Sequence, residues 1–420
     1  MKRIQLLLVS AMCFGCACSI GCGGGSSHPA TASTQPTNNI TTTGPNVLPI
    51  AVSGGPPGIG YVDGAFASVT VCVPGTSTCQ TIDNLLVDTG SVGLRIVSSE
   101  LTTVSLPQQK ASDGNAVVEC LPFLSSFTWG PVQTADLQIA GEKASSVPIQ
   151  VLSDSDFLVP SSCSSSGNPS ADTVANLGAN GILGVGQFAQ DCGGGCALAP
   201  STSANPTQNP DLYFECASAS ATCQPISEAT TQQVQNPVAL FASDNNGVIV
   251  ELPTVSGAET TVSGSLVFGI GTQSNNSLGS ATVYLMDPQT GNITTVFNGT
   301  TYTDASFLDT GSNGYFFADS SIPQCSNAPG FYCPTNTLNL SATNQGIPSG
   351  SGAVSFSVAN ADSLFANSGD FALGDLGGTM TPSNGVTFFD WGLPFFFGRN
   401  VYTAIEGKTA PGGATPYWAY

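Results

Sequence analysis

One four-residue stretch, Asp-Thr-Gly-Ser, occurs twice in the 420-residue chain, from Asp88 to Ser91 and from Asp309 to Ser312. Each copy follows an apolar run, Leu85-Leu86-Val87 in the first half and Phe307-Leu308 in the second. An apolar strand that stops on a carboxylate and turns through glycine presents that carboxylate at the strand end. Two such turns with matching flanks indicate an internal duplication, and they can bring two carboxylates face to face.

A second pattern follows each copy at a similar distance. In the first half it is Gly181-Ile182-Leu183-Gly184, which ends 96 residues after Asp88. In the second half it is Phe396-Phe397-Gly398, which ends 89 residues after Asp309. Each half is therefore predicted to contain Asp-Thr-Gly-Ser and, later, two apolar residues followed by glycine.

The flanks of these motifs resemble the pepsin-like aspartic proteases. The segments LLVDTGSVGLRI and FLDTGSNGYFF are similar to that family's two strand-turn-strand segments, and NGILGVG and PFFFGRNVYTAIEG resemble the strands that pass behind each aspartate. GSLVFGIG, at residues 264–271, resembles the strand that opens the second lobe. The resemblance covers about residues 51–420 and, within the superfamily, points to bacterial lipoproteins of uncharacterised function. It implies an all-β fold, a bilobal pepsin-like double β-barrel with the active-site cleft between the lobes.

The same resemblance makes Asp88 and Asp309 the catalytic pair of an aspartic endopeptidase. Two like charges at close range cannot both ionise cheaply, so the pair shares one proton. The ionised carboxylate would take a proton from a water that attacks a peptide carbonyl, while the protonated one hydrogen-bonds the carbonyl oxygen. By resemblance, the flanking residues support the pair: Thr89 and Thr310 cross-link the turns, Ser91 and Ser312 hydrogen-bond the outer carboxylate oxygens, and Gly90 and Gly311 admit backbone N–H groups.

The sequence departs from the family at the flap, the hairpin that closes over substrate. The flap is expected near Cys120 to Trp129, where no tyrosine occurs, and Phe123 is the candidate for the family's flap tyrosine. Arg95 stands where the family usually has a tryptophan, seven residues after the first aspartate. The two family residues hydrogen-bond each other, so this is a coupled change that affects flap geometry. Phe123 and Trp129 are equally compatible with core aromatics, and for Trp129 the core interpretation is favoured.

The N-terminus is typical of an exported lipoprotein. Met1-Lys2-Arg3 precedes an apolar run, Ile4 to Cys18, that is too short for a spanning helix and typical of a signal peptide. Ser19-Ile20-Gly21-Cys22 resembles a bacterial lipobox, so Cys22 is the expected lipidation site, an anchor that does not cross the membrane. The alternative is an ordinary cleavage site with incidental cysteines. Residues from Ser26 to about Pro49 have almost nothing to bury and are expected to form a disordered tether.

The rest of the chain favours β structure in two domains. It has 49 glycines, 28 prolines and only 8% charged residues, and its short apolar runs are broken by turn residues. We predict hairpins between 67–73 and 81–87 and between 281–286 and 293–298. About 370 residues would need an unusually large single core, so two lobes are expected, with the boundary between them in residues 225–242. The expected division is signal peptide 1–21, lipidated tether 22–49, N-terminal β lobe 50–233 and C-terminal β lobe 234–420.

Ten cysteines follow Cys22, and most of them fall in short-range couples. In an exported protein this predicts a disulfide framework. The expected pairs are Cys72–Cys79, Cys192–Cys196, Cys216–Cys223 and Cys325–Cys333, with Cys120–Cys163 remaining. A metal site is not expected, because paired Cys-x-x-Cys motifs are absent and the only histidine, His28, lies in the tether. The position of His28 also excludes Ser-His-Asp and Cys-His mechanisms, and no cofactor is expected.

Charge limits the partners, because 27 acidic residues face 7 basic ones and the net charge is −20. Nucleic acid and anionic lipid surfaces would be repelled, so the expected membrane contact is the lipid anchor alone. Such a chain becomes nearly uncharged when its carboxylates protonate, which avoids self-repulsion in acid. Solubility in the envelope explains the charge equally well.

Three functions fit these observations. The first is an aspartic endopeptidase, a monomer anchored in the bacterial cell envelope that cuts extended peptides or unfolded proteins at acidic pH. The second is a catalytically inactive lipoprotein that binds a peptide or a glycan in the cleft between the lobes. The third is a structural β protein with coincidental turns. The intact duplication counts strongly against the third and moderately against the second, because a binding protein has no need of two acids that repel each other.

Overall fold

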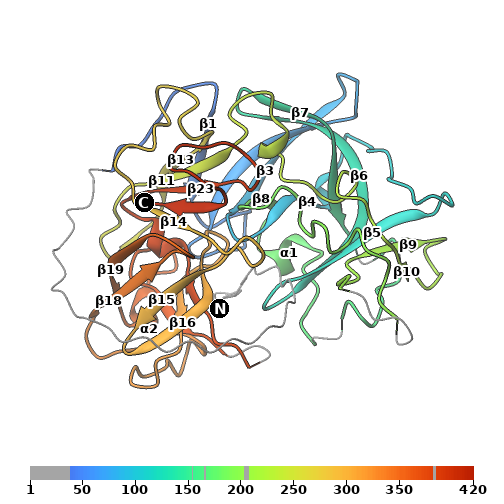
Figure 1. Ribbon diagram of the computed structural model, residues 1–420. Coiled ribbons are helices and arrows are strands. Elements are labelled where there is room, and N and C mark those ends of the chain that lie inside the picture. Colours follow the sequence, from blue (N-terminus) through green and yellow to red (C-terminus); the bar gives the residue numbers. More distant parts are fainter. Residues whose placement is uncertain (1–37, 154, 165–166, 203–207, 382–384) are drawn as a thin grey trace.

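The computed structural model describes residues 38–153, 155–164, 167–202, 208–381 and 385–420. Regular structure in these residues is nearly all β strand (Figure 1). Both described α-helices are single turns, α1 (Val174–Leu177) and α2 (Ala361–Leu364). The all-β prediction is therefore confirmed. The predicted signal peptide, the lipidation site Cys22 and the tether up to residue 37 lie outside the described residues.

The first half of the chain supplies ten strands of one large sheet, in the order β10-β9-β5-β6-β7-β4-β8-β3-β2-β1. Strand β2 also pairs with β6, so this part of the sheet curls back on itself as in a barrel. The strands are β1 (Val47–Val52), β2 (Ala65–Cys72), β3 (Cys79–Asp88), β4 (Val92–Val97), β5 (Ala116–Pro122), β6 (Phe127–Ile139), β7 (Glu142–Leu152), β8 (Gly181–Val185), β9 (Tyr213–Cys216) and β10 (Gln224–Pro225), with a 3₁₀ turn η1 (Ser98–Glu100).

The second half completes the large sheet with β13-β11-β23-β24-β14 and builds a seven-stranded sheet in the order β19-β18-β15-β16-β22-β17-β21. A short pair, β12 with β20, lies outside both sheets. The elements are η2 (Val238–Leu240), β11 (Gly247–Leu252), β12 (Ala258–Glu259), β13 (Val262–Phe268), β14 (Val283–Leu285), β15 (Ile293–Phe297), β16 (Thr300–Leu308), β17 (Tyr315–Phe317), β18 (Leu338–Gln345), β19 (Ser351–Val358), β20 (Ala372–Leu373), β21 (Gly377–Thr379), β22 (Phe389–Trp391), η3 (Leu393–Phe396), β23 (Arg399–Ala404) and β24 (Tyr417–Ala419).

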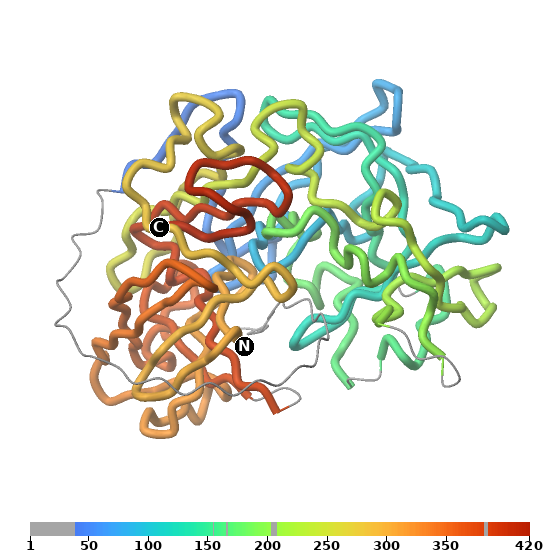
Figure 2. Tube along the Cα trace, viewed as in Figure 1, coloured from blue at the N-terminus to red at the C-terminus, as the bar shows by residue number. Residues whose placement is uncertain are grey.

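Strand β1 joins the two halves, because it pairs with β2 on one side and with β13 on the other. Figure 2 shows this blue start of the described chain beside later, yellow segments. The tether was expected to extend to Pro49, but Leu48 is buried and pairs with Leu266. Upstream, the Thr41 amide donates to Glu251. The tether prediction was wrong at this end, because a polar stretch can still be held by partners that its composition does not reveal.

One of the two predicted hairpins forms. Strands β2 and β3 pair antiparallel, with Cys72 opposite Cys79. The second hairpin is wrong: β14 pairs with β24, whereas β15 pairs with β16 and β18. The turn itself is present, since the Asp287 amide donates to the Asn292 carbonyl at 3.0 Å. A turn reverses the chain, but the pairing of each strand depends on the partners that the rest of the fold supplies.

All five predicted cysteine pairs are disulfide-bonded in the structure. Four of them close loops of 4 to 8 residues, and Cys120–Cys163 spans 43 residues. The long one ties β5 to the segment that follows β7. Disulfides of this number are typical of proteins that fold in an oxidising compartment.

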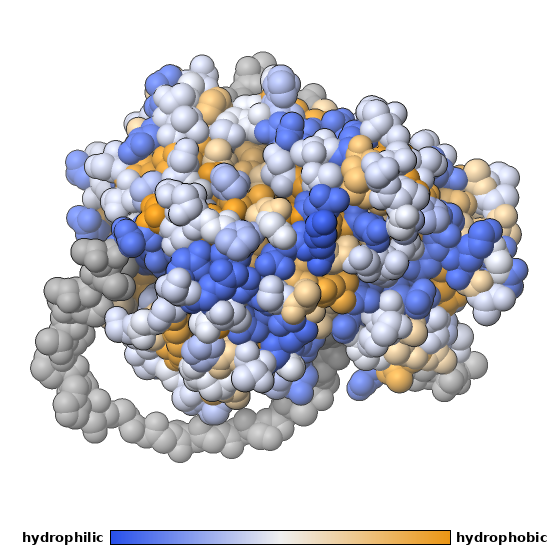
Figure 3. Space-filling model, turned by 90° about the horizontal axis from the view of Figure 1, so that it is seen from above, coloured by the Kyte–Doolittle hydropathy of each residue, from blue (hydrophilic) through white to orange (hydrophobic). Residues whose placement is uncertain are grey.

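The described surface is mixed in character. Figure 3 shows hydrophilic and hydrophobic residues interspersed over the face seen from above. The large apolar side chains exposed among the described residues are scattered along the chain: Leu158, Leu198, Leu240 and Val386. None of the described helices has both the length and the apolar character needed to cross a bilayer.

Candidate active site

Each Asp-Thr-Gly-Ser turn lies at the end of a strand that has a parallel neighbour. Asp88 ends β3 and stands opposite Gly184 on the parallel strand β8. Asp309 follows β16, whose parallel neighbour is β22, and its amide donates to the Trp391 carbonyl at 3.0 Å. Both aspartates are therefore held at equivalent points of the two halves, as the duplication predicts.

The stretch behind Asp309 differs from the one predicted. The sequence pattern assigned Phe396-Phe397-Gly398 to this place, but the residues beside Asp309 are Asp390-Trp391-Gly392. A Cβ atom on Gly392 would lie 2.7 Å from the Ser312 carbonyl, and one on Gly184 would lie 2.7 Å from the Val92 backbone, so both places require glycine. The true stretch was missed because an acid, Asp390, occupies a position where the pattern demanded an apolar residue.

The two turns are bonded to each other through their threonines. The Thr89 amide donates to Thr310 Oγ1 at 3.1 Å, and the Thr310 amide donates to Thr89 Oγ1 at 3.0 Å. The hydroxyls then donate onward, Thr89 to the Leu308 carbonyl at 3.1 Å and Thr310 to the Val87 carbonyl at 2.7 Å. Four reciprocal bonds between buried groups fix the two turns in a symmetric arrangement.

Asp88 accepts three hydrogen bonds from its own turn. The Gly90 amide donates to Oδ1 at 2.8 Å and the Ser91 amide at 3.2 Å, while the Ser91 hydroxyl donates to Oδ2. Donors of this kind stabilise the ionised form of a carboxyl. They favour Asp88 as the member of the pair that loses its proton first.

Asp309 has a similar set of donors. The Gly311 amide donates to Oδ1 at 2.7 Å and the Ser312 hydroxyl to Oδ2 at 2.8 Å. The glycines allow the carboxyls to approach the opposite turn. A Cβ on Gly90 would lie 2.7 Å from Asp309 Oδ1, and one on Gly311 would lie 2.8 Å from Asp88 Oδ1. The two Oδ1 atoms therefore face inward, and the two Oδ2 atoms are bonded to the serines.

Burial raises the pKa of both carboxyls, and the charge of Asp88 adds to the rise at Asp309. Neither aspartate is exposed to solvent. Burial raises the pKa of Asp88, and its hydrogen bonds from Ser91 and Gly90 oppose that rise. Burial also raises the pKa of Asp309, and the charge of Asp88 and then that of Asp390 raise it further, well above its ordinary value. The two carboxyls are therefore unequal, and Asp309 holds a proton more tightly than Asp88 does.

The flap region forms the predicted hairpin, but it is built into the sheet. Strands β5 and β6 are joined at a tight turn in which the Phe123 amide donates to the Ser126 carbonyl at 2.8 Å. Phe123 is buried in an apolar cluster of the first half that also contains Tyr61. Strand β9 pairs with the outer side of β5, and the Asn168 side chain donates to the Leu124 carbonyl in the turn at 3.0 Å. Trp129 is fully buried and packs edge-on against Phe214, as the core interpretation expected.

Arg95 ties the flap strand to the strand that follows the first turn. Its guanidinium is fully buried and forms ion pairs of 2.9 Å with Glu119 on β5 and with Asp191. Asp191 also accepts from the Tyr213 hydroxyl at 2.7 Å, and that hydroxyl accepts from the Val234 amide at 2.8 Å. Arg95 is therefore the centre of a buried charged network that joins β4 to β5.

A loop between β1 and β2 brings two further residues to the site that the sequence did not predict. Tyr61 is buried, its hydroxyl has no hydrogen-bond partner, and the charges of Asp309 and Asp88 both act to raise its pKa, after burial itself. Asp63 accepts from the Leu373 amide at 2.7 Å, and its own amide donates to the Phe371 carbonyl at 2.8 Å. These bonds join the two halves, and no sequence signal marks them because the partners lie about 310 residues apart.

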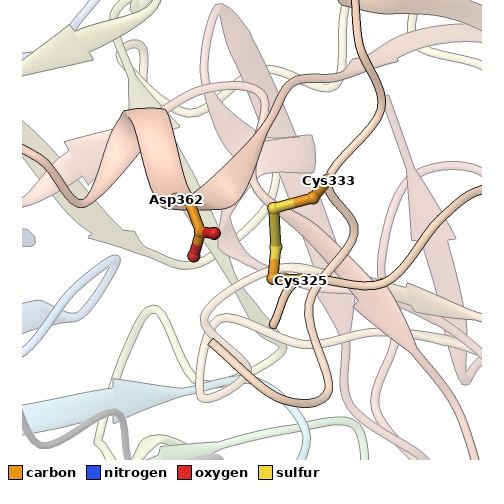
Figure 4. A group of neighbouring side chains, drawn as sticks. All are labelled: Cys325, Cys333 and Asp362. Atoms are coloured by element: carbon orange, nitrogen blue, oxygen red, sulfur yellow. A yellow bond between two sulfur atoms is a disulfide. The ribbon is translucent and has the colours of Figure 1, made fainter. Parts of the chain in front are cut away.

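One group of side chains in the described residues has the spacing of a metal site: Cys325, Cys333 and Asp362. Figure 4 shows the two sulfurs bonded to each other, with Asp362 beside them. A disulfide sulfur is not a thiolate, and thiolates are what bind metals of the zinc class. The group is therefore a structural crosslink.

The fold and the paired turns define the class: this is an all-β protein whose two halves each present an Asp-Thr-Gly-Ser turn, and the two turns are bonded to each other. In particular, the chain belongs to the family described as "Protein of unknown function (DUF3443)", whose model matches residues 42–420. No curated protein matches the chain. Among solved structures, the crystal structure of aspartic proteinase from Irpex lacteus is similar, with 15% identity, coverage of 85% of this chain and 93% of that chain, and a TM-score of 0.48.

Proposed function

We propose that this protein is an aspartic endopeptidase. One observation carries the proposal: two buried carboxyls, Asp88 and Asp309, face each other across turns that are cross-linked by Thr89 and Thr310. Placing two acids in contact without a cation costs free energy. A site that keeps both, with every supporting residue duplicated, is suited to acid-base chemistry.

The proposed mechanism divides the work between the two acids. Asp88 is the base, which takes a proton from a water lying between the inner Oδ1 atoms, because the charges of Asp88 and Asp390 raise the pKa of Asp309 beyond the effect of burial. Asp309 keeps its proton and donates a hydrogen bond to the oxygen of the peptide carbonyl as the water attacks. The serines hold the outer oxygens, so neither carboxyl can turn away from the water.

The proposed substrate is an extended peptide or an unfolded protein, and the enzyme acts as a monomer. Both carboxyls are fully buried, so a substrate reaches them only when the residues that cover them move. A net charge of −20 disfavours nucleic acid as a partner. We further propose that the protein is exported to the bacterial cell envelope and anchored there through a lipid on Cys22. Its disulfides fit an oxidising compartment.

One observation favours a second candidate, a catalytically inactive protein that binds a peptide or a glycan between the lobes. The two carboxyls have no solvent exposure. A closed site of this kind can hold a ligand without admitting a water for hydrolysis.

Cleavage of an unfolded protein by the full-length protein, measured from acid to neutral pH, tests the proposal. Asp88→Asn and Asp309→Asn serve as controls, and a statine-type transition-state mimic serves as inhibitor. We expect wild-type cleavage that is confined to acid, blocked by the mimic and lost in both variants. Binding of the mimic with no cleavage at any pH would favour the inactive binding protein, and activity that survives both substitutions would remove the dyad from the mechanism.

A further inference from the structure

Tyr61, in the loop between β1 and β2, carries a hydrogen-bond donor that the fold leaves unused. Its side chain is 3% exposed, and its buried hydroxyl forms no hydrogen bond with any described residue. Among the tyrosines of the described residues, it is the only one whose buried hydroxyl has no partner. A buried hydroxyl without a partner costs free energy, and a ligand that accepts its hydrogen removes that cost.

The packing of Tyr61 places its ring beside the first catalytic turn. The ring lies edge-on against Phe66, with the centroids 5.7 Å apart. Phe66 on β2 stands opposite Leu86 on β3, and all three residues belong to one apolar cluster. Leu86 precedes Asp88 by two residues, so both side chains leave β3 on the same face. The cluster therefore holds the Tyr61 ring on the face of β3 from which the Asp88 carboxyl projects.

The position of Tyr61 is fixed by its own loop. Its amide donates to the Gly54 carbonyl at 2.9 Å. A Cβ atom on Gly64 would lie 2.6 Å from Tyr61 Cδ1, so the ring rests directly on the glycine backbone. Two residues further on, the Asp63 amide donates to the Phe371 carbonyl at 2.8 Å. The ring is thus held in place before a ligand arrives, which reduces the entropy that binding would otherwise cost.

The electrostatic surroundings keep the Tyr61 hydroxyl neutral. Burial raises the pKa of this hydroxyl, and the charges of Asp309, Asp88 and Asp63 raise it further. The hydroxyl therefore keeps its hydrogen from acid to neutral pH, so it acts as a donor and not as a base. Negative charge attracts the hydrogen of a hydroxyl, which turns the donor toward the acids. Asp63 does not take up this hydrogen, because its Oδ2 also lacks a partner among the described residues.

We propose that Tyr61 binds the substrate, by donating a hydrogen bond from its hydroxyl to a carbonyl oxygen of the peptide that lies across Asp88 and Asp309. An extended peptide presents such an acceptor at every residue. Phe123, the candidate for the family's flap tyrosine, lies in the same apolar cluster and has no hydroxyl. The β1–β2 loop thus supplies a donor that the flap does not. The inference rests on the proposed function, since it requires a peptide at the dyad.

Tyr61→Phe removes the hydroxyl and keeps the ring. We expect the full-length variant to bind the statine-type mimic about 10-fold more weakly than wild type, and kcat/KM for an unfolded protein to fall about 10-fold. The variant without ligand should be as stable as wild type or more stable, because it no longer buries an unpartnered hydroxyl. The position of its pH–rate profile should not change, because Tyr61 does not titrate in that range.

Tyr332→Phe is the matched control, since it removes the hydroxyl of a buried tyrosine that has partners. The Tyr332 hydroxyl donates to the Phe317 carbonyl at 2.6 Å and accepts from the Asp319 amide at 3.0 Å. We expect the opposite result from this variant: a lower free energy of unfolding in urea, with binding of the mimic unchanged. Calorimetric titration with the mimic and urea unfolding provide both measurements for the two variants.

The inference is overturned if Tyr61→Phe binds the mimic as tightly as wild type. It is also overturned if Tyr61→Phe loses as much stability as Tyr332→Phe, which would make the hydroxyl a structural group. A shift of the pH–rate profile by about 1 unit or more would place the hydroxyl on a carboxyl of the dyad and would likewise overturn it. A wild type that binds the mimic and cleaves nothing would overturn the proposed endopeptidase alone, and the comparison of Kd values would still decide the role of Tyr61. A wild type that neither binds nor cleaves would overturn both.

Discussion

Thr89 and Thr310 each accept a hydrogen bond from the other's backbone amide, at 3.1 and 3.0 Å, and so join the two halves of the molecule at its centre. The partners are 221 residues apart in the chain. Because the threonine hydroxyls and the amides are buried, a substitution that removes a hydroxyl leaves the opposite amide without a partner and without access to water.

Thr310→Val should destabilise the protein by about 2 to 4 kcal/mol, because it leaves the Thr89 amide and the Val87 carbonyl buried without partners. Denaturant unfolding followed by tryptophan fluorescence measures the loss. Thr301→Val, an exposed position on the preceding strand β16, is the matched control and should change little. Equal effects of the two substitutions would show that the cross-link does not hold the halves together.

Removal of Arg95 should lower the free energy of unfolding more at neutral pH than in acid. Arg95→Met leaves Glu119 and Asp191 buried without their cation, at a cost of about 3 to 5 kcal/mol near pH 7. Burial and the charge of Glu119 already raise the pKa of Asp191 well above its ordinary value, and Arg95 opposes this. Without Arg95 the folded-state pKa rises further. A group with a raised folded pKa favours the folded state in acid and loses that contribution as pH rises, so the variant recovers stability near pH 4.

Urea unfolding of wild type and Arg95→Met at pH 4 and pH 7 measures this difference. Lys110→Met, which removes an exposed lysine bonded only to the Gly114 carbonyl, is the control for loss of a positive charge. A penalty for Arg95→Met that is equal at the two pH values would contradict the role assigned to the buried acids.

The disulfides should contribute according to the loop that each one closes. The 43-residue separation of Cys120 and Cys163 predicts about 4 kcal/mol from chain entropy, and the 4-residue separation of Cys192 and Cys196 predicts about 2 kcal/mol. Replacing each cysteine pair by alanines and measuring the loss in unfolding free energy tests whether the long-range disulfide contributes about twice as much as the short one. A larger loss from Cys192 and Cys196 would mean that the small ring holds native contacts beyond its chain constraint.

The sequence was most informative where the residues that matter are close together in the chain. Four disulfides and the β2–β3 hairpin were predictable because the partners are separated by short loops. The position of Asp309 was predictable because its whole motif is repeated. Gly392 was missed because the neighbouring Asp390 breaks the apolar pattern, and only the register of β16 with β22 identifies it.

Contacts between distant segments left no such signal. Asp63 meets Leu373 only when the two halves have folded against each other. The strands β14 and β15 looked like a hairpin because a turn joins them, yet each has its hydrogen-bond partners in a different sheet. Such contacts are decided by the packing of whole sheets, for which local residue patterns carry no information.

The last prediction concerns the dyad, and it links activity to stability through the same proton. Turnover requires one ionised and one protonated carboxyl, so the rate should follow a bell with an acidic maximum. Above the pKa of Asp309 the acid is lost, and below the pKa of Asp88 the base is lost. Asp309→Asn should remove nearly all turnover, and the double variant with Asp88→Asn should be no worse than either single one.

Asp309→Asn should lose activity but gain stability at neutral pH. The pKa of Asp309 is raised well above its ordinary value by burial and by the charge of Asp88, so the folded state binds protons more tightly than the unfolded chain. Its contribution is fully present below the unfolded pKa and is lost as pH rises through the folded pKa. Asp309→Asn should therefore be more stable than wild type near pH 7 and about equal to it near pH 3. Urea unfolding at both pH values measures this, and a variant that is less stable than wild type at pH 7 would show that the two carboxyls do not repel each other in the folded protein.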